Sequence, residues 1–203
     1  MILVIGNYRT GSTTLVDELA VAHGYQKPIT SGEFCNPDLG KLHDQMGWQR
    51  LPEQPPENFV VKVFKDQLIN YYKDEWYYYF RKYFIKRTEQ IYYSARDDFS
   101  KQLNSYLTAL ESGIWTPDMI TYNKELSQYI KPTTITDEII EASITTLKEN
   151  LEFQMMCHDL YGGTVIWLED REQSPYNDKL SYSHNQQTDI QSVKRYWRDW
   201  DCV

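Results

Sequence analysis

The chain of 203 residues has the length of one domain and is long enough to bury a core of its own. Hydrophobic residues make up 41% of it and charged residues 25%, which is typical of a globular protein rather than a disordered or fibrous one. The formal net charge is -8, which argues against a non-specific nucleic-acid binder, because such proteins need clustered Lys and Arg. Any anionic ligand is therefore expected in a local pocket.

The three cysteines, Cys35, Cys157 and Cys202, lie far apart without a CxxC pair, so the sequence predicts neither a disulfide framework nor a zinc site. No apolar run approaches the length needed to cross a bilayer, and the first residues lack the pattern of a signal peptide. Together these features predict a single domain over residues 1–203, located in the cytoplasm.

The predicted elements alternate along the chain. Short β-branched, apolar or aromatic runs indicate buried strands at 2–5, 59–64, 90–94 and 164–168. Helical patterns cover 13–22, 98–110, 136–160 and 187–200, with Thr136 as a candidate N-cap and Gly162-Gly163 as a stop. This alternation predicts an α/β fold in three layers, with a central, mostly parallel sheet flanked by helices. In such sheets, ligands bind at the carboxyl ends of the strands.

The segment between the first strand and the first helix has the spacing of a phosphate-binding loop. Gly6 and Gly11 match GxxxxG[K][ST], in which backbone N–H groups and the start of the following helix face a phosphate. Ser12 takes the place of the lysine, and a cation, Arg9, stands inside the loop. Arginine and hydroxyls without the lysine suit a single phosphate that carries another anionic group. The alternative is a strand–turn–helix without a ligand.

A nucleoside triphosphatase would need that lysine and an aspartate after a later strand to organise Mg²⁺, and Asp66 is only a weak candidate for it. A second anion site is expected after the strand 90–94. Arg96 follows that strand, and Ser105 lies two and a half helical turns further on. An arginine fork and a hydroxyl suit a separate phosphate, although Arg-Asp-Asp is also an ordinary helix start.

The two segments together resemble a known family. NYRTGSTTLVDEL (7–19) and YYSARDDFSKQLNSYLTALESGIW (92–115) are similar to the 5′-phosphosulfate and 3′-phosphate loops of sulfotransferases that use 3′-phosphoadenosine-5′-phosphosulfate (PAPS). The likeness is closest to the bacterial trehalose-type (glycolipid) carbohydrate sulfotransferases. These have a glutamine six residues and a serine nine residues after the arginine, and Gln102 and Ser105 stand at those distances from Arg96. A lysine-bearing second strand and a long helix before TVIWLEDR extend the likeness along most of the chain.

The resemblance implies a P-loop-like sulfotransferase domain that moves the sulfuryl group of PAPS to a hydroxyl of a carbohydrate or glycolipid and leaves 3′,5′-diphosphoadenosine (PAP), without a metal. Arg96 and Ser105 would hold the 3′-phosphate. The chain is short for the family, so its acceptor-binding elements are expected either to be trimmed or to come from the second subunit of a homodimer. The residues that would wrap the 5′-phosphosulfate are Arg9, Thr10, Gly11, Ser12, Thr13 and Thr14.

Sulfuryl transfer also needs a base for the acceptor hydroxyl and cations near the transferring oxygens. The family uses a glutamate in a segment like EYFNP, and GEFCNP places Glu33 there, with Cys35 where an aromatic is usual. An exposed loop glutamate is the alternative, and His43 is the second candidate for the base. Lys62, on the second strand, either stabilises charge on the leaving phosphate or lies on a solvated edge.

A tyrosine-rich stretch, 71–84, has one face at helical spacing that is expected to join the core. Its other tyrosines and nearby basic residues suit a sugar acceptor or an anionic glycolipid. Two other functions stay open: a P-loop nucleotide kinase or other phosphotransferase, and a non-catalytic nucleotide-binding relative. The members of the face are Tyr72, Trp76, Tyr79, Phe80 and Tyr83.

Overall fold

The computed structural model describes residues 1–28, 32–35, 54–115 and 132–170. The chain divides into two compact units. The first consists of Met1–Ala95 with Lys148–Ile166, and the second of Arg96–Leu147 with Trp167–Val203. The predicted helix 187–200 and the candidate base His43 lie outside the described residues.

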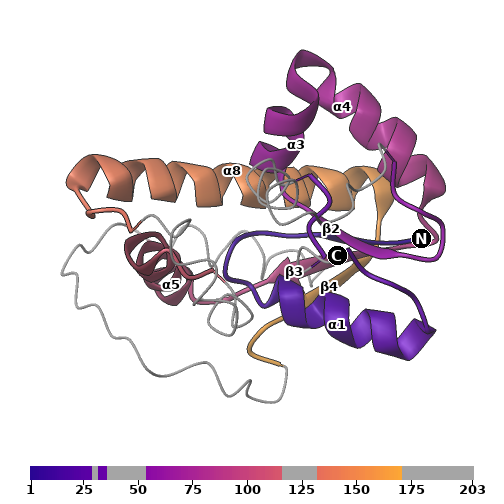
Figure 1. Ribbon diagram of the computed structural model, residues 1–203, viewed down its shortest axis with the longest axis horizontal. Helices are drawn as coiled ribbons and strands as arrows, with labels where there is room; N and C mark the ends of the chain where they lie inside the picture. Colours follow the sequence, from indigo (N-terminus) through magenta and orange to yellow (C-terminus); the bar gives the residue numbers. More distant parts are fainter. Residues whose placement is uncertain (29–31, 36–53, 116–131, 171–203) are drawn as a thin grey trace, which may run out of the picture. The chain divides into compact units, whose positions relative to one another are not determined.

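A four-stranded parallel sheet forms the centre of the fold (Figure 1). Its strand order is β2-β1-β3-β4. Every residue of β1 is buried, because a central strand covered on both faces has no solvent side. The α/β fold with a central parallel sheet is therefore confirmed. The strands are β1 (Ile2–Ile5), β2 (Val60–Val63), β3 (Gln90–Ala95) and β4 (Thr164–Trp167).

Helices cover both faces of the sheet. One side of β1 and β2 packs against α1 (Ser12–His23) through Val4, Val16 and Val60. The other side packs against α3 (Lys65–Tyr72) and the second half of α8 (Asp137–Tyr161), in a larger cluster that includes Phe153. Figure 1 shows α1 on one side of the strands and α3, α4 and the second half of α8 on the other.

The second unit contains α5 (Phe99–Ser112) and the first half of α8. The side chain of Asp98 caps α5 by accepting the Lys101 N–H at 3.0 Å. At the start of α8, the Ile139 N–H donates to the Thr136 hydroxyl at 3.4 Å. Because caps and periodicity are local signals, the helices of 98–110 and 136–160 are found within two residues of their predicted bounds.

The tyrosine-rich stretch is not one helix, which corrects the expected continuous pattern. After α3, Lys73 adopts φ 55° and ψ -136°, which no α-helix accommodates. The chain then continues as a 3₁₀ turn (Lys73–Glu75), α4 (Trp76–Tyr79), a π-helical turn (Phe80–Phe84) and a second 3₁₀ turn (Ile85–Arg87). The apolar face still reaches the core, because Phe80 is fully buried and Tyr72, Trp76 and Tyr83 pack against the cluster.

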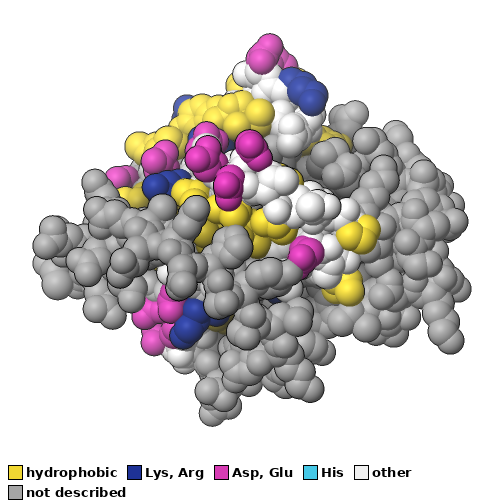
Figure 2. All heavy atoms as spheres, turned by 90° about the vertical axis from the view of Figure 1, so that its left-hand side faces the viewer, with side chains coloured by type: hydrophobic (Ala, Val, Ile, Leu, Met, Phe, Trp, Pro, Cys, Tyr) yellow, Lys and Arg dark blue, Asp and Glu magenta, His cyan; other side chains and the backbone are white. Residues whose placement is uncertain are grey.

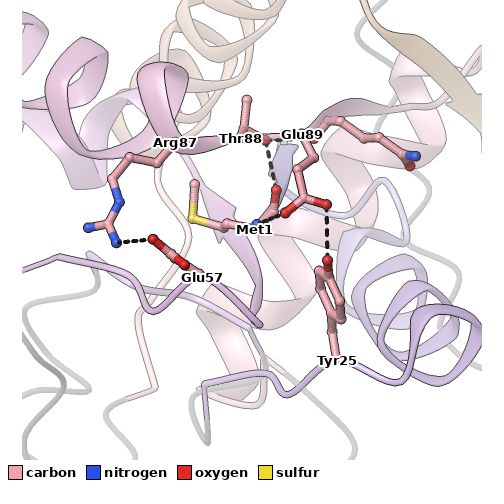
Figure 3. Close-up of polar contacts among 7 residues, drawn as sticks. Met1, Tyr25, Glu57, Arg87, Thr88 and Glu89 are labelled. Carbon is pink, nitrogen blue, oxygen red and sulfur yellow. Dashed lines mark hydrogen bonds and ion pairs between the residues drawn. The ribbon is translucent and has the colours of Figure 1, made fainter.

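Polar contacts tie the amino ends of β1 and β3 together (Figure 3). The Met1 amino group donates to Glu89 Oε1 at 2.7 Å, and the Tyr25 hydroxyl donates to Glu89 Oε2 at 3.0 Å. The Thr88 hydroxyl donates to the Met1 carbonyl at 3.2 Å, and Arg87 faces Glu57 at 4.0 Å. These contacts fix the end of the sheet that lies opposite the predicted loop.

The outer side of β2 is also paired. The Val60 N–H donates to the Gln26 carbonyl at 2.8 Å, and the Lys62 N–H donates to the Gly32 carbonyl at 2.7 Å. Glu33 forms an isolated parallel bridge with Lys62. The segments around Gln26 and Glu33 therefore cover an edge that would otherwise expose its backbone groups.

None of the helices within the described ranges is long and apolar enough to cross a membrane. On the described part of the face shown in Figure 2, acidic side chains lie among hydrophobic ones. This surface agrees in sign with the net charge of -8.

Candidate active site at the carboxyl end of the sheet

The loop between β1 and α1 is held in a conformation that its glycines make possible. A Cβ on Gly6 would lie 2.8 Å from the ring of Phe64, so no larger residue fits there unless the ring moves. Gly11 has φ 70° and Arg9 has φ 62°, both in the left-handed region. Gly11 is the N-cap of α1 and supplies no side-chain cap. The loop therefore turns sharply into a helix start, as a phosphate-binding loop does.

Two side chains of the loop anchor it from within. The buried Thr10 hydroxyl donates to the Asn7 carbonyl at 2.7 Å, so Ser94 is the donor in the 2.7 Å bond between the two hydroxyls. Tyr8 stacks on Phe64 with ring centroids 4.4 Å apart and donates to Asp66 at 2.7 Å. Thr10 was expected at the ligand, but its hydroxyl is engaged in holding the loop.

Asp66 is likewise occupied by protein groups. Its Oδ2 accepts from Tyr8, and its Oδ1 accepts from Asn150 Nδ2 at 3.1 Å. Asn150 Oδ1 in turn accepts the Lys65 N–H at 2.7 Å. Asp66 therefore ties the loop to α8, and this arrangement gives no support to the aspartate that a Mg²⁺-dependent kinase would need.

Glu33, Lys62 and Thr13 come together beside the first turn of α1. Lys62 is in register with Val4, so its side chain lies on the α1 side of the sheet. Its Nζ donates to Thr13 Oγ1 at 2.8 Å and lies 3.3 Å from Glu33 Oε1. The Lys62 side chain is only 2% exposed, and that of Glu33 is 13% exposed. The solvated-edge interpretation of Lys62 is wrong, because segment 32–35 covers that edge.

The charges around Lys62 act in opposite directions on its ammonium. Burial lowers the pKa of Lys62 from its usual value, because the charged form loses its hydration. Glu33 and Asp17 oppose this shift and raise the pKa, whereas the nearby Arg9 lowers it further. The charges of Arg9 and Asp17 therefore act on the Lys62 ammonium, although Asp17 itself forms an ion pair with Lys27.

Sequence reasoning missed Gln67 and Asp17. Gln67, in the first turns of α3, donates through Nε2 to Glu33 Oε2 at 3.0 Å. The carboxylate thereby receives one donor on each oxygen. Gln67 Oε1 is buried without a hydrogen-bond partner. The only sequence signal for Gln67 was its position shortly after the carboxyl end of β2, because ligand-binding sites in parallel sheets lie at the carboxyl ends of the strands.

The second predicted anion site lies in the second unit. Arg96 follows β3 directly, its side chain is 11% exposed, and its Nε lies 3.4 Å from Glu169 Oε1. The other oxygen of Glu169 accepts the Asp97 N–H at 3.1 Å. Ser105 is half-buried on α5, and Gln102 is buried. Glu169, which the sequence analysis did not single out, thus holds both Arg96 and the backbone beside it.

The remaining loop residues differ in exposure. Ser12 is buried at the start of α1, whereas Thr14 is exposed. Among the residues that the structure describes, no group of three His, Cys, Asp or Glu side chains is arranged to hold a metal ion. Comparisons with protein-family models, with curated proteins and with solved structures gave no match to the chain.

Proposed function

We propose that the protein transfers the sulfuryl group of PAPS to a hydroxyl of a carbohydrate or glycolipid acceptor. The observation that carries the proposal is the contact of Lys62 with both Glu33 and Thr13, directly beside a glycine loop that contains Arg9. A base and two cations are the protein groups that such a transfer requires. The motif resemblance supplies the identity of the donor.

Each residue has a defined task in this proposal. The loop backbone and the start of α1 bind the 5′-phosphosulfate, and Arg96 with Ser105 binds the 3′-phosphate. The acceptor oxygen attacks the sulfur of PAPS in line, the bond between that sulfur and the 5′-phosphate oxygen breaks, and PAP leaves with its electron pair. Glu33 accepts the proton of the acceptor hydroxyl, and Gln67 and Lys62 orient its carboxylate. Lys62 and Arg9 stabilise negative charge that develops on the oxygens of the donor.

Nucleotide selectivity tests the proposal most directly. Isothermal titration without Mg²⁺ should show PAP binding far more tightly than ADP. Replacing Arg96 with Ala should weaken PAP binding by roughly 1.5–3 kcal/mol, the value of a charge-assisted hydrogen bond, and leave ADP binding almost unchanged. The matched control is Arg81→Ala, which removes the same charge from an exposed position in the first unit. Mg²⁺-dependent binding of ATP in preference to PAP would replace this proposal with a kinase.

Turnover separates an enzyme from a non-catalytic relative. Glu33→Gln keeps the size of the side chain and removes the proton acceptor, so PAP affinity should persist while transfer falls by about 100-fold or more. The measurement is release of PAP from PAPS with trehalose and a total lipid extract as acceptors. An unchanged rate in Glu33→Gln excludes Glu33 as the base.

A further inference from the structure

Five tyrosine rings make a continuous contact chain on the surface formed by α3, α4 and the π-helical turn. Tyr71 meets Tyr72 with centroids 4.8 Å apart, and Tyr72 stacks on Tyr79 at 5.0 Å. Tyr79 then stacks on Tyr83 at 5.4 Å and meets Tyr78 at 5.2 Å. Tyr71 is 43% exposed and Tyr78 is 59% exposed. We call these five residues the tyrosine ladder.

Basic side chains accompany the tyrosine ladder. The Lys82 ammonium lies over three of its rings, 4.9 Å from the centroid of Tyr83, 5.6 Å from that of Tyr78 and 5.9 Å from that of Tyr79. Lys82 and Lys86 are both exposed. Segment 71–87 has five basic and two acidic residues, whereas the whole chain has a net charge of -8. A positive aromatic surface therefore stands out on an acidic protein.

The tyrosine ladder begins next to the candidate site. Tyr71 follows Gln67 by four residues in α3, so the two side chains lie one turn apart on the same helix face. Gln67 donates to Glu33, and Tyr72 packs against the core cluster that contains Cys35. The start of the ladder is thus linked to Glu33 through Gln67, one helical turn away.

We propose that the tyrosine ladder with Lys82 and Lys86 docks the protein onto an anionic lipid bilayer. Tyrosine rings favour the headgroup region, where the ring is desolvated and the hydroxyl stays hydrated. Lysines add attraction to anionic lipids, and this attraction falls with salt. The exposed rings are too few to insert deeply, so the docking is peripheral and reversible. The second consequence, which rests on the proposed function, is that the acceptor is a glycolipid displayed by that bilayer.

Vesicle sedimentation with the full chain tests the docking. The probes are vesicles of phosphatidylcholine alone and of phosphatidylcholine with roughly a third phosphatidylglycerol. We expect binding only to the anionic vesicles, and loss of it at high salt. The double variant Lys82→Gln/Lys86→Gln should bind about tenfold more weakly, since each lysine near the surface contributes a few-fold. Tyr78→Ala should weaken binding to the same vesicles without changing its salt dependence.

The matched control is Lys101→Gln/Lys148→Gln, which removes two exposed lysines from α5 and α8 and should bind like the wild type. Equal weakening in both double variants would show a general charge effect and overturn the docking surface. Binding of soluble heparin with no binding to vesicles would overturn it in favour of a polyanion site. PAP binding without vesicle binding overturns only this inference, and vesicle binding without PAP binding overturns only the proposed transfer.

Discussion

Burial of the Lys62 ammonium removes it from water, and the neighbouring carboxylates of Glu33 and Asp17 offset part of that cost. The ion pair between Lys62 and Glu33 therefore depends on the packing that positions the two side chains as well as on the attraction between their charges. Its geometry is fixed by three different parts of the chain, because Glu33 lies in segment 32–35, Lys62 on β2 and Thr13 on α1. Residues so constrained are expected to affect stability as well as activity.

Replacing Lys62 with Met should cost roughly 2–4 kcal/mol of unfolding free energy at neutral pH, because it leaves the Glu33 carboxylate without its ammonium partner. The double variant Lys62→Met/Glu33→Gln should lose less, since neither charge is then left alone. Urea denaturation of both variants measures the difference. A double variant less stable than Lys62→Met would contradict the pairing.

The lowered pKa of Lys62 also gives stability a pH dependence of known sign. Between the lowered folded-state pKa and the unfolded value of 10.5, the unfolded chain binds more protons than the folded one. The unfolding free energy of the wild type should therefore rise with pH through that window, relative to Lys62→Met. Parallel pH curves for the two proteins would mean that Lys62 titrates normally.

At the scale of elements, the strands and helices were predictable because their signals are local. The runs 2–5 and 90–94 are recognisable as strands from β-branched and aromatic residues alone, and Thr136 and Gly162 mark the ends of α8. The interruption at Lys73 was not predictable, because neither glycine nor proline signals it. Further along, Phe80 and Phe84, the first and last residues of the π-helical turn, are both buried, which periodicity for a regular α-helix does not predict.

Parts of the candidate site were likewise predictable from local sequence signals, and other parts were not. The glycine spacing predicted the loop, and the position of Lys62 in an apolar strand made it a candidate for stabilising charge on the leaving phosphate. The identities of Gln67 and Glu169 as partners could not be derived from the sequence, because each contact joins residues that are far apart in the sequence. Pairing across a fold depends on register and helix rotation, which periodicity does not specify.

The packing of the loop against Phe64, the residue directly after β2, gives a prediction for Gly6. Gly6→Ala should destabilise the protein by about 1–3 kcal/mol, because the added methyl group overlaps the Phe64 ring. In a Phe64→Leu background the same substitution should cost much less, since the smaller side chain makes room. Chemical denaturation of all four proteins forms a double-mutant cycle.

Gly24→Ala is the control for backbone strain, because Gly24 has φ 65° and a Cβ added there would meet no atom within 4 Å. It should cost about 1 kcal/mol in either background. If Gly6→Ala costs as much in the Phe64→Leu background as in the wild type, the overlap with the ring is not the cause.

For the molecule as a whole, two thiols report on the integrity of the first unit. Cys35 and Cys157 are both buried in the cluster that joins the sheet to α3 and α8. Burial raises the pKa of Cys157 to about 12 and also raises the pKa of Cys35, because a thiolate would lose its hydration there. Above the pKa of a thiol in the unfolded chain there is therefore a pH range in which both folded thiols keep their protons and the unfolded thiols lose them.

We therefore expect neither thiol to react with a disulfide reagent at about pH 8 in a Cys202→Ser variant, until urea unfolds the protein. The stability that they contribute is present below pH 9 and declines as the pH rises further, because the unfolded thiols ionise first. Reaction of one thiol equivalent without denaturant would mean that the cluster opens locally. The same two positions replaced by Ala should lessen the alkaline decline.

The backbone bridge between Glu33 and Lys62 gives segment 32–35 two structural roles, which are covering the edge of β2 and positioning the Glu33 side chain. The segment that pairs with the outer side of β2 also holds the Glu33 carboxylate against the Lys62 ammonium. A substitution that shifts the pairing of segment 32–35 with β2 would expose the edge of β2. The same shift would move the Glu33 carboxylate away from Lys62. Aggregation and loss of function should consequently arise in the same variants.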